Sequence, residues 1–269
     1  MHPPAPPSTS QHSCPPRPPT AVAGGIAFHA VSREVLCEQV GGFIDCGEAH
    51  VVHFLSVDPT VVAQRDADYR RALQTADLTV ADGLPVKWVL NTAGLGTERI
   101  AGTESMEILP EWGLSRDAGH FFYGGSPEVR DRLPAVLAER HPGIRITGAV
   151  SPPYRPLTDE EIVEAAEQIA DAGTDILWIG LGTPAQHVVG ERLRQLGAAP
   201  VIVCVGAAFD FTAGVKQRAP RWMQRTGLEW AHRLASEPRR LWRRYLIGNP
   251  LFVKAVVAER RRARRERRR

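Results

Sequence analysis

One acidic residue stands where a strand of an α/β protein would end. Asp82 follows the short apolar run 78–81 and precedes Gly83. A carboxylate at a strand end, partly removed from water, has a raised pKa and can accept a proton from a sugar hydroxyl. The same residue could instead be the N-cap of the helix expected from Leu84, and the sequence pattern favours neither role over the other.

Arg99 is a candidate for binding an anionic ligand. It lies in a loop rich in glycine and threonine that includes Thr103. A guanidinium group in such a loop can hold a diphosphate through paired N–H donors. The alternative for Arg99 is a surface salt bridge.

Small and polar residues follow several other expected strands. Ser56 and Asp58 come at the end of one apolar run, and Asp58 before a proline is typical of a helix N-cap first and of a ligand second. The remaining members of this set are Gly124, Gly125, Gln186, Gly206 and Asp210. Glycine lets backbone N–H groups approach phosphate oxygens, and helix N-termini favour anions. The set therefore predicts a phosphate-bearing ligand at one edge of a sheet.

The sequence predicts neither a metal site nor a cofactor. Asp66 and Asp68 have the spacing of a metal-binding pair, but they lie in a segment of helical period, which favours a solvated helix face. His50 and His53 would point to opposite faces of a regular strand, which is poor geometry for one ion.

Seven β-rich runs alternate with helical segments and position these residues. The expected strands are 26–29, 50–56, 78–81, 120–123, 144–149, 176–180 and 201–205. Alternating βα units require parallel strands with right-handed crossovers, and helices then cover both faces. The predicted fold class is α/β, a Rossmann-like and mostly parallel sheet, with a basic helical C-terminal appendage. The glycine motifs of dinucleotide and P-loop proteins are missing from the sequence.

Charge is distributed unevenly along the 269 residues. Residues 218–269 hold 17 Lys/Arg against four acids, a net charge of +13, whereas the whole chain is +3 and residues 1–217 are therefore −10. This asymmetry indicates a polyanionic partner, either an anionic membrane surface or nucleic acid. Tryptophan and tyrosine interleave with the arginines, as in helices that lie at a membrane interface, so the membrane surface is favoured.

Eight motifs occur in order along the chain. They are ADG at 81–83, RIAGTE at 99–104, YGGSP at 123–127, GLGTPAQ at 180–186, VGAAFDF at 205–211, RAP at 218–220, GLEW at 227–230 and EPRR at 237–240. Together they resemble the WecG/TagA/CpsF glycosyltransferases, glycosyltransferase family 26, over roughly residues 25–255.

The resemblance implies an inverting, metal-independent transferase at the cytoplasmic face of the cell membrane. Such enzymes move a sugar, often N-acetylmannosamine, from its UDP form to a polyprenyl-diphosphate-linked sugar in polysaccharide or teichoic-acid-type synthesis. Asp82 matches the proposed general base. The matching substrate-binding positions are Ser56, Asp58, Arg99, Gln186, Arg233, Arg240 and Arg243.

Four positions depart from the family pattern. Ser56 and Asp58 replace Thr and Asn, Glu104 replaces Asp, and His187 replaces Glu. An ionised aspartate only accepts hydrogen bonds, so Asp58 changes what the site can donate. Another donor such as UDP-glucose or UDP-galactose, an inactive family member, and a polyanion-binding protein that uses the arginine-rich tail therefore stay open as alternatives.

Four regions are expected. They are a disordered proline-rich leader at 1–24, a catalytic α/β domain at 25–217, a helical membrane-associating appendage at 218–258 and a disordered arginine-rich tail at 259–269. The leader lacks the apolar block of a secretory signal, and no stretch approaches the ~20 apolar residues of a spanning helix. The four cysteines follow no zinc spacing, so we expect reduced thiols in a cytoplasmic protein that lies on the inner membrane face. An isologous dimer is the default assembly.

Overall fold

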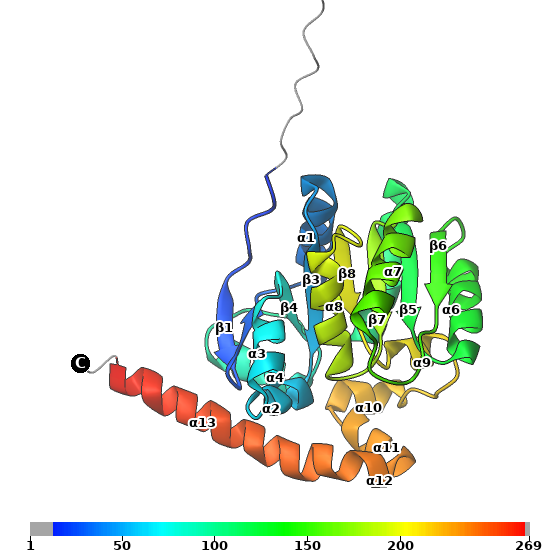
Figure 1. The fold of residues 1–269 in the computed structure, drawn as a ribbon. Coiled ribbons are helices and arrows are strands. Elements are labelled where there is room, and N and C mark those ends of the chain that lie inside the picture. The colour runs from blue at the N-terminus through cyan, green and yellow to red at the C-terminus, as the bar shows by residue number, and fades with distance from the viewer. Residues whose placement is uncertain (1–12, 267–269) are drawn as a thin grey trace, which may run out of the picture.

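Six parallel strands form the central sheet in the computed structural model, which describes residues 13–266 (Figure 1). The strands lie in the order β4-β3-β8-β7-β5-β6, and every neighbouring pair is parallel. Their bounds are β3 His50–Leu55, β4 Leu78–Ala81, β5 Gly119–Gly124, β6 Arg145–Val150, β7 Ile176–Gly180 and β8 Val201–Cys204. The predicted Rossmann-like α/β class is confirmed.

Helices cover both faces of this sheet. Their bounds are α1 Arg33–Cys46, α2 Val57–Ala63, α3 Ala67–Gln74, α4 Leu84–Thr92, α5 Gly102–Gly113, α6 Pro127–Arg140, α7 Asp159–Asp171, α8 Ala185–Gln195 and α9 Ala208–Thr212. One face packs on α1, α5, α6 and α9, and the other packs on α7 and α8. Burial on both faces explains the apolar character of the strands, since all residues of β3 and β8 are buried.

A β-hairpin precedes the sheet and corrects one expectation. The predicted strand 26–29 exists as β2 (Ile26–His29), but it pairs antiparallel with β1 (Thr20–Ala23) and is not part of the parallel sheet. Gly24 and Gly25 both have positive φ, the conformation of a type I′ two-residue turn, and this turn directs β2 back along β1. The folded chain thus begins before residue 25, and residues 1–12 of the expected leader lie outside the described residues.

The C-terminal helices lie across the carboxyl end of the sheet, below it in Figure 1. They are α10 Arg221–Thr226, α11 Glu229–Ser236, α12 Pro238–Trp242, the π-helical turn η2 Arg243–Ile247 and α13 Gly248–Glu266. Residues 259–266 are helical and were expected to be disordered; arginine and alanine are strong helix formers, and this extends α13. Residues 267–269 lie outside the described part of the chain. Within residues 13–266, no helix is both long and apolar enough to cross a bilayer.

The last helix is docked on the hairpin and on α2. Phe252 is 3% exposed and belongs to the same apolar cluster as Phe28, Val57 and Val61. The backbone N–H of Gly24 also donates to the Glu259 carboxylate (3.3 Å). These contacts join the two ends of the described chain.

Two cysteines that were expected to be reduced form a disulfide. Cys14 and Cys46 are bonded, while Cys37 and Cys204 are free. The pairing could not be read from a sequence separation of 32 residues, because the hairpin and α1 bring the two cysteines together. Cys204 is fully buried, as predicted for a small apolar side chain.

We expect Phe252→Ala to lower the free energy of unfolding by about 3–5 kcal/mol, the usual cost of removing a buried phenylalanine side chain. Its neighbour Val253 is 59% exposed, so Val253→Ala should change stability by less than about 0.5 kcal/mol. Urea unfolding followed by circular dichroism compares the two variants. Equal effects would show that α13 is not docked as described.

Candidate active site

A pocket opens between the carboxyl ends of β3 and β4 and the C-terminal helices. Most of its polar lining comes from Ser56, Asp58, Asp82, Arg99, Gln224, Glu229, Arg233, Arg244, Tyr245 and Asn249. Three distant parts of the sequence therefore meet here: the two strand ends, the loop before α5, and residues 224–249. Five of the predicted site residues are brought together in this pocket, namely Ser56, Asp58, Asp82, Arg99 and Arg233.

Asp82 lies on the sheet side of the pocket, directly after β4. Its backbone N–H donates to the carbonyl of Leu55 (3.1 Å), which extends the strand pairing by one residue. The N-cap of α4 is Gly83 and not Asp82, so the capping alternative is not adopted. Among the residues whose side chains the structure describes, which leave out Arg221 and Arg225, no group donates a hydrogen bond to the Asp82 carboxylate. This carboxylate is thus available to a ligand.

The surroundings of Asp82 raise its pKa to about 6. Burial is the largest cause, because it disfavours the charged carboxylate. Arg233 and Arg99 act in the opposite direction, while the carboxylates of Glu229 and Glu104 raise the pKa further. A group with this pKa can take up and release a proton near neutral pH.

Arg99 lies between this pocket and an adjoining one. Its Nη2 donates to Glu104 Oε1 (2.6 Å), and its Nη1 lies 3.5 Å from the backbone carbonyl of Asp82. Thr103 lines the adjoining pocket together with Glu104 and Arg218. Arg99 therefore forms a salt bridge, which was the alternative to ligand binding, and it also lines a pocket, as ligand binding would require.

Ser56 and Asp58 are contacted by an arginine from the C-terminal helices. Arg244 Nη2 lies 3.4 Å from Ser56 Oγ, and Arg244 Nε lies 3.4 Å from Asp58 Oδ2. The N-cap of α2 is Ser56, without a side-chain cap hydrogen bond. Asp58 is consequently an ion-pair partner at the pocket and does not have the N-cap role that the sequence favoured.

Glu229 holds two more arginines of the same segment. Arg218 Nε and Arg233 Nη2 each lie 3.7 Å from Glu229 Oε1. The Arg233 guanidinium also lies over the ring of Phe211, 4.8 Å from its centre. Positive charge is thus placed beside Asp82 by pairing with a carboxylate and by stacking on an aromatic ring.

Arg240 and Arg243 were predicted at the site and lie outside this pocket. Arg240 pairs with Glu237 and is largely exposed, and Arg243 stacks on Trp242 at 5.2 Å. The backbone of η2 is π-helical, which shifts the phase of its side chains relative to an α-helix. Arg244 is therefore the residue that reaches the pocket.

The other predicted residues lie along the ends of β5, β7 and β8. A side chain at Gly124, which has φ of 131°, would place its Cβ 2.6 Å from the Gly180 carbonyl carbon. At Gly206 a Cβ would lie 2.8 Å from Gln186 Oε1. Gly124 is therefore required by close packing on the Gly180 backbone, and Gly206, which has positive φ, by the approach of the Gln186 side chain. Gly125 also has positive φ and directly precedes the N-cap of α6.

Asp210, the last predicted residue of this group, pairs with Lys216 at 3.0 Å. Neither residue is among those that line the pocket around Asp82. Asp210 thus forms an ion pair outside this pocket, and its contact with a ligand stays a prediction.

Gln186 is held by a buried polar network. Its Nε2 lies 3.2 Å from His187 Nε2, and the Tyr69 hydroxyl lies 2.9 Å from His187 Nδ1. Burial is the main reason that the pKa of His187 falls well below its usual value, and the neighbouring His53 adds to it. A neutral imidazole at position 187 thus connects α8 to α3.

Four residues line the pocket that were not among the predicted site residues: Arg244, Glu229, Trp230 and Tyr245. One signal was present, because Glu229 and Arg233 are spaced i,i+4 on a helix, where opposite charges pair. No comparable signal marked Arg244, which depends on the π-helical turn.

Comparison with known proteins agrees with the motif pattern. The profile of the family described as "Glycosyl transferase WecG/TagA/CpsF family" matches residues 21–266. A Bacillus subtilis (strain 168) protein named N-acetylglucosaminyldiphosphoundecaprenol N-acetyl-beta-D-mannosaminyltransferase is 30% identical over 226 residues, which cover 81% of this chain and 86% of that protein. A protein of the same name from Bacillus spizizenii is 31% identical over 196 residues, which cover 72% and 74% of the two chains.

We expect the Asp82 carboxyl group to titrate near pH 6 in the ligand-free protein, as observed by NMR of its carboxyl carbon. Glu229→Gln should lower this pKa, because it removes a carboxylate that raises it and leaves Arg233 without that partner. Arg233→Gln should raise it, because it removes a cation that stabilises the ionised form. Shifts of the opposite sign would contradict the electrostatic description of the pocket.

Proposed function

The chain belongs to the WecG/TagA/CpsF family of glycosyl transferases and is a glycosyltransferase, and from this premise we propose its reaction. It transfers an N-acetylmannosamine-type hexose from a UDP-sugar to a sugar carried on polyprenyl diphosphate. The names of the two Bacillus relatives support this choice of acceptor and sugar. The transfer belongs to the synthesis of a cell-surface polymer of the teichoic-acid type.

The observation that carries the proposal is the Asp82 carboxylate in its pocket. It is free of hydrogen-bond donors among the described residues, its pKa is about 6, and arginines from two segments lie near it. A base of this pKa is largely ionised at neutral pH and still accepts a proton from a hydroxyl as that hydroxyl becomes acidic in the transition state.

The proposed step is a single displacement. Asp82 removes the proton from the acceptor hydroxyl while the hydroxyl oxygen bonds to the anomeric carbon of the donor sugar. The bond between that carbon and the UDP oxygen breaks, and its electron pair leaves with UDP. One base opposite one leaving group inverts the anomeric centre, so a second catalytic carboxylate is not required.

Arginine side chains are suited to stabilise the leaving diphosphate. Arg99, Arg233 and Arg244 all line the pocket, and each is paired with a carboxylate, from Glu104, Glu229 and Asp58 respectively. A diphosphate can replace or supplement these carboxylates as the hydrogen-bond acceptor. Charge stabilisation by arginine underlies our proposal that the transfer needs no metal ion.

Asp58 is the position where we expect donor selection to differ within the family. Its carboxylate lies at the pocket and only accepts hydrogen bonds when ionised. We propose that it accepts a hydrogen bond from a donor-sugar hydroxyl while it is paired with Arg244. Donors that differ at this hydroxyl, such as UDP-glucose and UDP-galactose, are the natural comparison.

An anionic membrane surface is the proposed partner of the C-terminal helices. Large apolar side chains are exposed on consecutive elements of this segment: Trp222, Leu228, Trp230, Trp242, Leu246, Ile247, Val253 and Val257. Arginines interleave with them, as an interface of apolar tails and phosphate headgroups requires. The match of the family profile through residue 266 supports this use of the segment over nucleic-acid binding.

We expect Asp82→Asn to lower the transfer rate about 10²–10⁴-fold, the usual contribution of a general base. The assay offers UDP-N-acetylmannosamine, UDP-glucose or UDP-galactose with a short-chain prenyl-diphosphate-linked sugar and follows UDP release. Binding of the donor should persist in the variant, because the arginines are unchanged. Asp68→Asn, on the exposed face of α3, is the matched control and should keep full activity. Wild-type rates in Asp82→Asn would refute the base assignment.

Replacement of Trp242 and Leu246 together by serine should weaken binding to anionic vesicles at least about tenfold, since one large apolar side chain contributes roughly 1.5–3 kcal/mol on burial. Val163 and Leu196 are exposed on α7 and at the end of α8, so their double serine variant serves as the control. Vesicle co-sedimentation measures both. An equal loss in the two variants would contradict docking through the C-terminal helices.

A further inference from the structure

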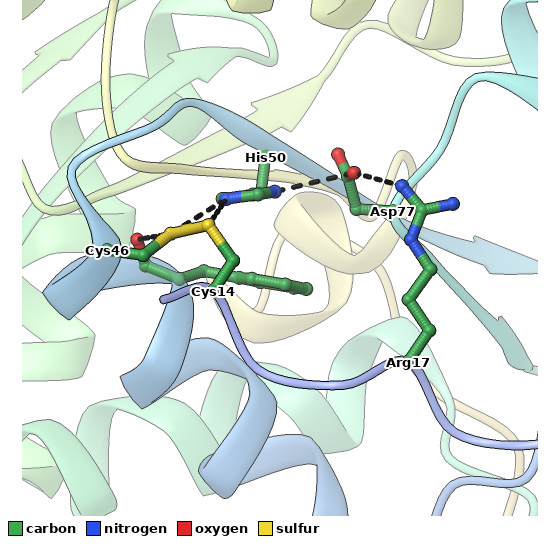
Figure 2. Close-up of a disulfide and its surroundings, with 6 residues drawn as sticks. Cys14, Arg17, Cys46, His50 and Asp77 are labelled. Atoms are coloured by element: carbon green, nitrogen blue, oxygen red, sulfur yellow. Dashed lines mark hydrogen bonds and ion pairs between the residues drawn. A yellow bond between two sulfur atoms is a disulfide. The ribbon is translucent and has the colours of Figure 1, made fainter. Parts of the chain in front are cut away.

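Cys14, Cys46 and His50 form a cluster at the opposite end of β3 from the Asp82 pocket. His50 Nε2 lies 3.1 Å from Cys46 Sγ and 3.6 Å from Cys14 Sγ (Figure 2). One ligand atom from each of the three residues lies within 4.8 Å of the other two. Among the described residues, this is the only group of three His, Cys, Asp or Glu side chains with such spacing.

The imidazole of His50 is fixed on three sides. Its ring stacks on Phe43 with centres 4.2 Å apart, and the residue is 6% exposed. Its second nitrogen, Nδ1, lies 3.4 Å from Asp77 Oδ1. A proton on Nδ1 faces this carboxylate, which leaves the lone pair of Nε2 directed at the two sulfurs.

Asp77 is held in place behind His50. The Val51 backbone N–H (3.0 Å) and Arg17 Nη2 (2.7 Å) both donate to its carboxylate. A carboxylate behind the far nitrogen of a histidine is the usual outer partner of a metal-binding imidazole, because it fixes the tautomer and the ring orientation.

A disulfide does not account for this arrangement. A disulfide sulfur has no proton to donate, so it is a poor partner for the Nε2 lone pair. A bridge that only tied residue 14 to α1 would need neither the imidazole nor the carboxylate. Two thiolates and an oriented imidazole are, by contrast, a ligand set that soft divalent cations of the zinc class prefer.

We propose that the reduced cysteine pair and His50 bind one zinc-class divalent cation. A dithiol reductant converts the disulfide to two thiols and is itself oxidised to a disulfide, and the cation then replaces the two thiol protons. In a tetrahedral site with metal–sulfur bonds of ~2.3 Å the sulfurs lie about 3.8 Å apart, so reduction opens the space that the ion needs. Cys14 and Cys46 are half-buried, and a water molecule would complete the four ligands of a tetrahedral site.

The charges of the cluster balance when the cation is bound. Two thiolates neutralise the divalent ion, and Arg17 neutralises Asp77. The imidazole of His50 adds no charge to this balance, because a metal-bound histidine is neutral. No further counter-ion is needed, which removes the main cost of placing charge in a partly buried site.

The cluster connects the segment 13–19, which we call the N-terminal strap, to the end of α1. The strap is also held by Gln39 Nε2, which donates to the Pro16 carbonyl (3.0 Å), and it leads directly into β1. Bound cation and disulfide are thus two alternative links at one position, selected by the redox state of the thiols. This site is independent of the proposed transferase reaction.

The test uses the full chain, reduced with dithiothreitol under nitrogen and desalted, with Co²⁺ as the probe. We expect a thiolate-to-cobalt absorption band that saturates at one ion per chain and disappears when Zn²⁺ is added. The oxidised protein, Cys14→Ser and His50→Ala should lack the band, while Cys37→Ser on α1 should retain it. Asp77→Asn should weaken Co²⁺ binding about 10–100-fold.

Alkylation of the wild-type chain supplies a readout that needs no variant. Zn²⁺ should slow the reaction of iodoacetamide with Cys14 and Cys46, located by peptide mass mapping, and leave its reaction with Cys37 unchanged. A reduced wild-type protein without the cobalt band, or with unprotected Cys14 and Cys46, would show that the pair is a disulfide alone and would overturn the proposal.

Discussion

The partial removal of the Asp82 carboxylate from water is the constraint on which the site depends. Strand β4 brings this residue to the edge of the sheet, and the C-terminal helices cover it from the other side. Burial disfavours the charged form of the carboxyl group and so raises its pKa. Arg99 and Arg233 lower the pKa of Asp82, whereas Glu229 and Glu104 raise it. The proposed role of Asp82 as a base therefore requires both signs of charge in the pocket. A carboxylate of very low pKa would not accept a proton, and one that stays protonated could not act as a base.

The strong positive charge of the C-terminal segment has two separate uses in the structure. Arg218, Arg233 and Arg244 point inward and pair with carboxylates of the pockets. The arginines near the end of α13 are exposed to solvent. Arg218 and Arg244 pair with Glu104 and Asp58 of the acidic body, so part of the opposite charge of the two segments is used within the chain. The exposed arginines of α13 are available to an external polyanion.

The sequence predicted the sheet well because strands buried on both faces leave a continuous apolar signal. Strands 78–81 and 176–180 were predicted at their observed bounds. The position of Asp82 could be predicted in the same way, because the end of a strand and the residue after it are local features of the sequence. Arg244 and the Cys14–Cys46–His50 cluster were not, because a π-helical turn and a hairpin bring those side chains into place. The expected end of helical structure near residue 258 was also wrong, since the apolar contacts of Phe252 and Val256 anchor a helix whose later residues favour helix by propensity.

The packing of α13 would link the proposed membrane contact to the geometry of the pocket. Val57 and Val61 of α2 share one apolar cluster with Phe252 and Val256 of α13. The same short helix α2 carries Asp58, and Arg244 reaches it from the turn just before α13. A force that moves α13 would therefore move both members of this ion pair. If the exposed apolar side chains dock on a bilayer as proposed, this docking would hold the pocket in its assembled form at the surface that carries the proposed lipid-linked acceptor. A chain away from the membrane would lose that support.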